Sequence, residues 1–385
     1  TAQLDLENCI GFVTEVGGKT AHSAIMARSL ELPAVVGVKG ILGEVKDGEV
    51  IIMDGETGEL FLEPSEELVS EYIKKQEVLR VEKEELKKLI HEDAVTTDGR
   101  KVDIWGNIGS PNDVNAVIES GATGIGLYRT EFLFMNSDHF PTEQEQYEAY
   151  RIVAEKMQGK PVTIRTMDIG GDKELPYLDL PKELNPFLGY RAIRISLENK
   201  DMFKTQLKAI LRASQYGQIK IMYPMISSVN EIRKANAILE ECKKELDEIG
   251  KIYDRNIKVG IMVETPSTAI IAYKFAKEVD FFSIGTNDLT QYFLAVDRGN
   301  EMVANLYNSF NPAVLEAIQK VIDAAHDAHI SVSMCGEFAG DKRATKLLLG
   351  MGLDSFSMSA SSGLTVKKII RNSSYADAQK FRDLI

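Results

Sequence analysis

Arginines, carboxylates and one cysteine recur at the ends of predicted β-strands in this chain of 385 residues. Arginine suits the planar, bidentate binding of phosphate and carboxylate groups. Glu264 and Asp288 together suit Mg²⁺, which takes one or two protein carboxylates besides phosphate oxygens and water. The set therefore indicates a small, highly anionic phospho-compound bound together with Mg²⁺. Its members are Arg129, Arg165, Arg191, Arg298, Glu264, Asp288 and Cys335.

His22 forms a second candidate site, remote from the first in sequence. The preceding Gly17-Gly18 pair permits a tight, exposed turn, and Thr20 is a suitable N-cap for a helix over about residues 21–30. His22 would then lie in the first turn, where free N–H groups and the helix dipole favour an anion. A neutral imidazole there is able to accept a phosphoryl group as a nucleophile. His91, His139, His326 and His329 lack this context, and we interpret them as structural or surface residues.

The elements that must position the first set alternate regularly between strand and helix from Thr97 onward. The apolar runs predict strands at 102–107, 124–128, 162–166, 220–223, 258–263, 281–284, 330–334 and 353–356. Amphipathic stretches predict helices at 111–120, 142–157, 201–216, 228–248, 266–277, 312–328 and 341–350.

Eight strand-then-helix units in about 290 residues match a (β/α)8 barrel, whose active site lies at the carboxyl ends of the strands. The rival fold is an open, doubly wound sheet. Gly124-Ile125-Gly126 lacks the third glycine of the dinucleotide fingerprint, so we favour the barrel.

The distribution of predicted strands and helices divides the chain into three segments. Residues 1–63 are predicted to form a small α/β unit, with short apolar runs separated by turns such as Asp47-Gly48. Residues 64–93 are predicted to form a charged linker helix, because no glycine and no further proline interrupt them. Residues 94–385 would form the barrel.

Composition narrows the class of protein. Lys+Arg 45 against Asp+Glu 58 gives a net charge of −13, which argues against a nucleic-acid or anionic-membrane partner. No transmembrane run and no signal peptide are visible. Cys9, Cys242 and Cys335 are too few and too scattered for a disulfide framework or a zinc site, so we expect a reducing, cytoplasmic compartment. The chain lacks an initiator Met, and we expect a fragment of a longer protein.

The sequence resembles the phosphoenolpyruvate-utilising enzymes, and within them Enzyme I of the sugar phosphotransferase system. The segment GGKTAHSAIMARSLELPAVVG around His22 is similar to the phosphohistidine motif of that family. The runs IRTMDIGGDK at 164–173 and GLYRTEFLF at 126–134 resemble Enzyme I rather than its relatives. GIMVETP at 260–266, IGTNDLTQY at 284–292 and MCGEFAG at 334–340 follow in the same order.

This resemblance implies a barrel preceded by a swivelling phosphohistidine domain, and it implies roles for single residues. His22 would take the phosphoryl group from phosphoenolpyruvate (PEP) through Nε2. Glu264 and Asp288 would ligate Mg²⁺, and Cys335 would protonate C3 of the departing enolate to give pyruvate. The residues that would bind the substrate are Arg129, Arg165, Arg298 and Asn287, with Arg191 at the rim of the site.

Members of the family begin with about 170 further residues, including a helical domain that docks the phosphocarrier protein HPr, and end some twenty residues beyond Ile385. The phosphohistidine domain of this chain would therefore be partial. The resemblance also implies a homodimer built by the barrel.

Two alternatives stay open at this point. Pyruvate phosphate dikinase and phosphoenolpyruvate synthase share the histidine motif, the arginines and the cysteine, and the IRTMDIGGDK string argues against them. A non-catalytic PEP-sensing scaffold would not need His22, Glu264, Asp288 and Cys335 together.

Overall fold

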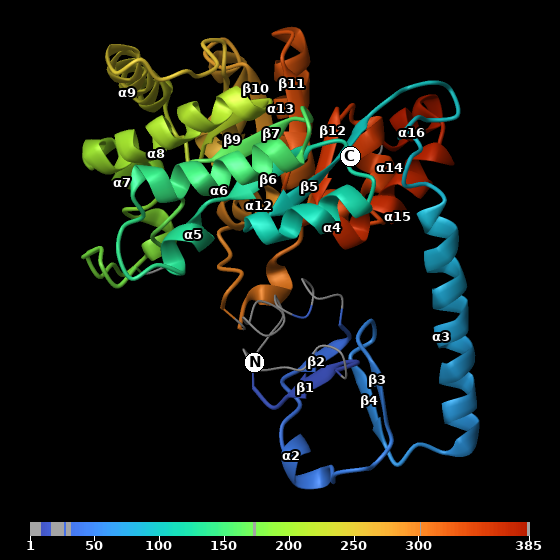
Figure 1. Cartoon of the computed structure of the whole chain (residues 1–385). Helices are drawn as coiled ribbons and strands as arrows, with labels where there is room; N and C mark the ends of the chain where they lie inside the picture. Colours follow the sequence, from blue (N-terminus) through green and yellow to red (C-terminus); the bar gives the residue numbers. More distant parts are fainter. Residues whose placement is uncertain (1–8, 17–26, 28–31, 172–174, 301, 383–385) are drawn as a thin grey trace. The chain divides into compact units, whose positions relative to one another are not determined.

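The computed structural model describes residues 9–16, 27, 32–171, 175–300 and 302–382. The chain divides into two compact units, Thr1–Lys87 and Lys88–Ile385, and each is described by itself. Figure 1 labels the elements of both units.

The first unit contains two small pairs of strands. β1 (Phe12–Thr14) lies parallel to β2 (Ala34–Val36), and β3 (Ile51–Asp54) lies antiparallel to β4 (Glu59–Leu62). The short helix α2 (Ile41–Glu44) lies between the two pairs in sequence. The turn before β4 follows β3 directly. In that turn the Asp54 carboxylate accepts hydrogen bonds from the N–H groups of Glu56 and Thr57.

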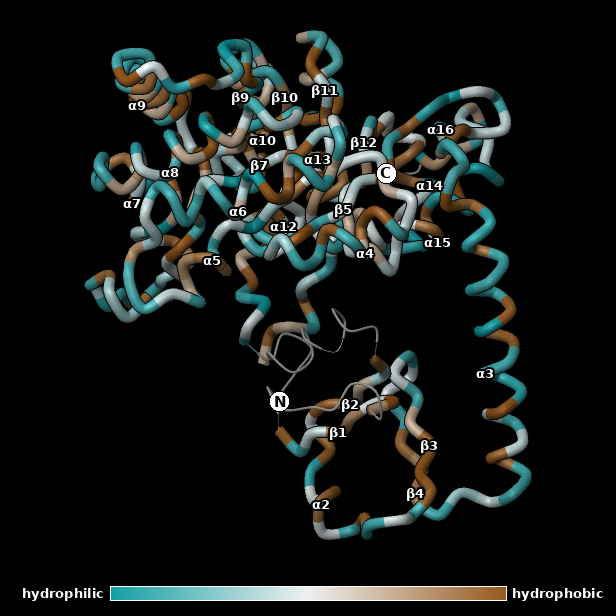
Figure 2. Tube along the Cα trace, viewed as in Figure 1, coloured by the Kyte–Doolittle hydropathy of each residue, from teal (hydrophilic) through white to brown (hydrophobic). Residues whose placement is uncertain are grey.

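α3 (Glu66–Lys87) covers most of the predicted charged helix and has no buried residue. Its tube in Figure 2 is mostly hydrophilic, with separate hydrophobic patches. The helix contacts the β3–β4 hairpin of the same unit. Lys75 pairs with the buried Asp54 carboxylate, and the rings of Tyr72 and Phe61 lie 5.7 Å apart.

The second unit is a (β/α)8 barrel. Its eight strands are all parallel and close in the order β10-β11-β12-β5-β6-β7-β8-β9. Their bounds are β5 Asp103–Ile108, β6 Ile125–Arg129, β7 Val162–Arg165, β8 Ile219–Tyr223, β9 Lys258–Val263, β10 Phe281–Ile284, β11 Ser331–Met334 and β12 Ser355–Met358.

Helices surround this barrel, as Figure 1 shows. They are α4 Val114–Glu119, α5 Glu131–Met135, α6 Glu143–Lys156, α7 Ile193–Glu198, α8 Lys200–Ala213, α9 Val229–Glu248, α10 Pro266–Ile270, α11 Ala272–Phe275, α12 Thr286–Leu294, α13 Pro312–Asp327, α14 Thr345–Gly350, α15 Ala360–Arg371 and α16 Tyr375–Arg382. Capping boxes formed by Thr142 with Glu145 and by Ser228 with Glu231 start α6 and α9. The barrel unit also contains short 3-10 helices, which are η1 Pro111–Asp113, η2 Pro186–Leu188, η3 Ser214–Tyr216, η4 Ala304–Leu306 and η5 Glu337–Gly340.

The predicted barrel is confirmed, and β9 and β10 have the predicted bounds. The predicted helix 266–277 is instead two short helices, α10 and α11, because the backbone of Ile271 leaves the helical region. The predictions missed α5, α7 and α12, which are short helices in the loops after strands. Their apolar pattern covers too few turns to show a helical period.

A small apolar cluster inside the barrel supports the site above it. It joins Leu127, Met222, Met262 and Phe281 from four strands with Cys335, which directly follows β11. The large core that packs the outer faces of the strands against the helices forms a separate cluster. In the described part of the chain, no helix combines the length and the hydropathy that a membrane span requires.

Candidate active site

The parallel barrel brings the predicted site residues to the carboxyl ends of five strands. Arg129 and Arg165 are the last residues of β6 and β7, and they lie opposite each other in the strand register. Glu264 follows β9, Asp288 lies in the first turn of α12 after β10, and Cys335 follows β11. Residues up to 206 positions apart in sequence thus meet at one end of the barrel.

Arg165 is held between two carboxylates in the interior. Its Nη2 lies 2.6 Å from Oε1 of Glu131, and its Nη1 lies 3.1 Å from Oδ2 of Asp168. All three side chains are buried. A buried charge must be paired to be tolerated, so these carboxylates fix the plane of the guanidinium and direct its remaining surface toward the site.

Arg191 does not lie at the rim of the site, as the resemblance had implied. Its side chain is only 5% exposed, and its Nη2 lies 3.0 Å from Asp168 and 3.1 Å from Asp288. Its Nη1 donates a hydrogen bond to the hydroxyl of Tyr292 at 3.2 Å. The rim prediction is wrong because Asp168 and Asp288 draw the guanidinium into the interior.

Glu264 is a carboxyl group of the site with a strongly raised pKa. Burial, together with the nearby Asp288 and Asp168 carboxylates, raises its pKa to about 8, against the opposing effect of Arg165 and Arg191. The N–H of Met225 donates to its Oε1 at 2.6 Å. Glu264 is thus buried close to two further carboxylates, and a cation would relieve the repulsion between them.

The donor set around Glu264 and Asp288 fits a hard cation that shares its coordination with a ligand. Oδ1 of Asp288 is buried and accepts no hydrogen bond from a described residue, although Arg298 lies 3.5 Å away. No cluster of three or more His, Cys, Asp or Glu side chains with metal-site geometry occurs in the described ranges. Two carboxylates supplemented by phosphate oxygens and water are the usual environment of Mg²⁺.

Arg129, Arg298 and Asn287 border this interior. Arg129 is half-buried, and its guanidinium makes no hydrogen bond or ion pair with any described residue, which leaves it available to an anionic ligand. Oδ1 of Asn287 accepts a hydrogen bond from the N–H of Glu337 at 2.9 Å, so α12 is tied to the loop that follows Cys335. The predicted substrate residues thus share one end of the barrel.

Cys335 is 2% exposed, and burial raises the pKa of its thiol to about 11. The thiol is therefore protonated at neutral pH, as an acid must be. The backbone carbonyl of Cys335 accepts a hydrogen bond from Nδ2 of Asn107 at 2.9 Å. A side chain at Gly336 would collide with Thr286, so a glycine there permits the close approach of this loop to α12.

Comparisons with known proteins settle the family. The PEP-binding domain of the PEP-utilising enzymes matches residues 83–375, and the mobile domain of the same enzymes matches residues 1–58. The phosphoenolpyruvate-protein phosphotransferase of Bacillus subtilis is 55% identical over 385 residues, which is 100% of this chain and 68% of that protein. This chain belongs to the phosphoenolpyruvate-protein phosphotransferase family. The family member of Haemophilus influenzae is 55% identical over 383 residues, or 67% of its length.

The chain thus spans about two thirds of the length of these family members. Their shared name is that of an enzyme, and it favours the Enzyme I assignment over the dikinase and synthase alternatives. His22 falls in the segment matched by the mobile domain. It lies outside the described residues, as does nearly all of the helix predicted at 21–30.

Several side chains of this family site were not predicted as site residues. Glu131 and Asp168 stand beside Arg129 and Arg165 in the sequence, and a carboxylate next to a strand-end arginine was a usable signal. Asn107, Gln206 and Tyr292 reach the site only through contacts made by the fold. Tyr292 ends the IGTNDLTQY run, which was a usable signal, whereas no local pattern distinguishes Asn107 and Gln206.

The raised pKa of Cys335 predicts an unreactive thiol. In the native chain at pH 8, iodoacetamide should label the half-buried Cys9 and leave Cys335 unmodified, because roughly one Cys335 thiol in a thousand would be ionised. Labelling of Cys335 should rise as the pH approaches 11, as long as the chain stays folded. Peptide mass spectrometry after timed labelling measures both rates. Equal labelling of Cys335 and Cys9 at pH 8 would contradict the buried, protonated thiol.

Proposed function

We propose that this chain catalyses phosphoryl transfer from PEP to His22, and from there to the phosphocarrier protein HPr, with release of pyruvate. This is the first step of sugar uptake by the phosphotransferase system. The observation that carries the proposal is the pair of arginines, Arg129 and Arg165, at adjoining strand ends and at the same end of the barrel as Cys335. The relatives that match the whole chain are named for this activity.

The arginines account for binding of the substrate phosphate. Arg165 is oriented by Glu131 and Asp168, and Arg129 lies opposite it in the register with its guanidinium available. Fixed positive groups of this kind stabilise the charge of a loose phosphoryl-transfer transition state without having to reorganise. Asn287 and Arg298 would contact the substrate beside them, and Arg191 would hold Asp168 and Asp288 in place.

Glu264 and Asp288 would hold Mg²⁺, whose positive charge helps to neutralise the phosphate group when the ion is bound. Their burial and the unsatisfied oxygen of Asp288 support this assignment.

The P–O bond of PEP breaks as a P–N bond forms to Nε2 of His22, which leaves the enolate of pyruvate. The S–H group of Cys335 then gives its proton to C3 of the enolate, which produces pyruvate and a thiolate. The thiolate regains a proton from solvent. The raised pKa of Cys335 supports the role of acid and makes the return of the proton favourable.

The organisation of the chain is part of the same proposal. Residues 1–63 would be a partial phosphohistidine domain, 64–93 a helical linker and 94–385 the PEP-binding and dimerisation domain. A cytoplasmic location and a homodimer stay predictions, the latter testable by analytical ultracentrifugation.

The test is incubation with ³²P-labelled PEP and Mg²⁺, followed by mapping of an acid-labile phosphate. We expect the label on His22 without ATP or AMP, and its transfer to added HPr. Stable PEP binding with no label at His22 in a full-length protein would refute the phosphotransferase function.

Replacing Cys335 by alanine separates phosphoryl transfer from proton transfer. Cys335→Ala should still bind PEP with Mg²⁺, while sustained pyruvate formation falls by about a hundredfold, because general acid catalysis contributes on this scale. Residual turnover would come from released enolpyruvate, which forms the keto acid in water. Steady-state pyruvate production in the full-length protein measures this, together with deuterium incorporation at C3.

Cys9→Ala and Cys242→Ala are the matched controls. Cys242 is fully buried but belongs to the outer core, so its loss should affect stability more than turnover. If Cys335→Ala matched the wild type in rate and in the stereochemistry of deuterium delivery, the cysteine would not be the proton donor.

A further inference from the structure

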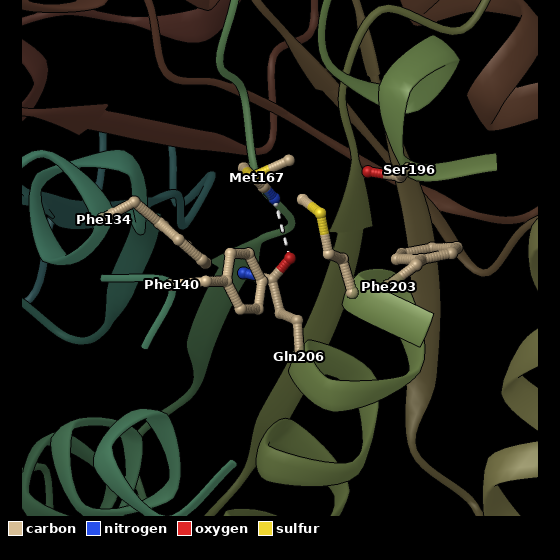
Figure 3. A pocket seen from close by; sticks show the side chains of 7 residues that line it. Phe134, Phe140, Met167, Ser196, Phe203 and Gln206 are labelled. Atoms are coloured by element: carbon tan, nitrogen blue, oxygen red, sulfur yellow. Dashed lines mark hydrogen bonds between the residues drawn. The ribbon is translucent and has the colours of Figure 1, made fainter. Parts of the chain in front are cut away.

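A buried hydrogen-bond network lies behind the two strand ends that carry Arg129 and Arg165. Its centre is Gln206, on α8, which is 2% exposed. Oε1 of Gln206 accepts a hydrogen bond from the N–H of Met167 at 2.8 Å, drawn as a dashed line in Figure 3. Its Nε2 donates to Oγ1 of Thr130 and to the hydroxyl of Tyr150, both at 3.2 Å. Both Nε2 hydrogens and one lone pair of this amide are thus engaged.

Thr130 extends the network to the neighbouring strand. Its hydroxyl donates to the carbonyl of Arg165 at 2.8 Å. The register between β6 and β7 ends at the pair Arg129 and Arg165. Beyond that pair, the segments that follow β6 and β7 are no longer joined by the backbone ladder. Side-chain hydrogen bonds from Gln206 and Thr130 hold these two segments together instead.

These two segments carry the groups that orient the anion site. Thr130 lies between Arg129 and Glu131, and Met167 directly precedes Asp168. One amide therefore restrains the spacing of the two arginine-bearing strand ends and of the carboxylates that pair with Arg165.

The space beside this amide is closed to water. The gap beside it has no room for a water molecule and is lined by Phe134, Phe140 and Phe203, among other residues (Figure 3). Loss of the Gln206 amide would leave the N–H of Met167 buried without a partner, and such a group is costly unless the backbone moves. A backbone shift at Met167 would move Arg165 and Asp168 with it.

We propose that Gln206 is a positioning residue that, through Met167 and Thr130, sets the relative placement of Arg129 and Arg165. The inference rests on the proposed function, in which these guanidiniums bind the phosphate of PEP. It predicts that the network affects substrate binding beyond its effect on stability, because a small misplacement of a phosphate-binding group is costly.

The test compares Gln206→Met, Thr130→Val, Thr130→Ser and Tyr150→Phe in the full-length protein. Calorimetry with PEP and Mg²⁺ gives the affinity, and thermal unfolding gives the Tm. Thr130→Val, which keeps the shape of the side chain, and Gln206→Met should each weaken PEP binding by about tenfold. Thr130→Ser keeps the hydroxyl and should restore the affinity.

Tyr150→Phe is the matched control. It removes one buried hydrogen bond of the same amide, and also the bond that the Tyr150 hydroxyl donates to Gln146, but leaves the bonds to Met167 and Thr130. Its Tm should therefore fall while its affinity stays within about twofold of the wild type. Normal affinity in Thr130→Val, or affinity that simply follows Tm in all four variants, would overturn the inference alone. Absence of PEP binding by the wild type would overturn the proposed function and this inference together.

Discussion

His22→Ala should abolish phosphorylation of the chain by PEP and leave PEP binding to the barrel nearly unchanged. The nucleophile would be lost, but the four arginines and both candidate Mg²⁺ ligands lie in the separate unit Lys88–Ile385. Labelling with ³²P-PEP measures the first effect, and calorimetry on the same full-length variant measures the second. Affinity should change by less than about tenfold, or 1.4 kcal/mol.

His91→Ala is the control, because His91 is exposed and was interpreted as a structural or surface residue. It should be labelled as strongly as the wild type. A phosphorylated His22→Ala variant would place the nucleophile elsewhere, and a large loss of PEP affinity would contradict the separation of the histidine from the anion site.

Arg165→Lys should lower kcat/KM by about a hundredfold, even though the charge is kept. The guanidinium uses Nη2 for Glu131 and Nη1 for Asp168, and these atoms diverge from one planar group. A single ammonium cannot reproduce both contacts and also hold phosphate oxygens in plane. At least one buried carboxylate would lose its partner, so the Tm should fall as well.

Steady-state kinetics with PEP, Mg²⁺ and HPr measure the effect in the full-length protein. Arg233→Lys is the matched control, because Arg233 also makes two contacts to a carboxylate, Glu278, but on the exposed surface. It should match the wild type in both rate and Tm. Turnover of Arg165→Lys at the wild-type rate would show that Arg165 acts only as a distant charge.

The barrel was predictable because its signal is local. Each buried strand is a short apolar run, and long amphipathic helices such as α9 and α13 repeat their apolar positions over several turns. The alternation of the two, with the size of the repeat, gives the fold. The short helix α12 escaped prediction because its apolar pattern covers too few turns, the first of which holds polar site residues.

The identities of the site residues were equally accessible from the sequence. Parallel strands in a barrel have their carboxyl ends on one side, so Arg129, Arg165, Glu264 and Cys335 had to lie at the same end once the strands were known. The motif around His22 combines the Gly17-Gly18 pair, the N-cap candidate Thr20 and the histidine itself. This combination is visible in the sequence without knowledge of any tertiary contact.

The barrel, the end of it that carries the site and the family of the chain could thus be predicted from the sequence. The three-dimensional structure was needed to show that Arg191 is buried between Asp168 and Asp288, that burial raises the pKa of Cys335, and that Gln206 is bonded to both arginine-bearing segments. These contacts join residues 23 to 97 positions apart. They depend on strand register and on how much of each side chain is removed from water, and neither quantity is encoded in any single stretch of sequence.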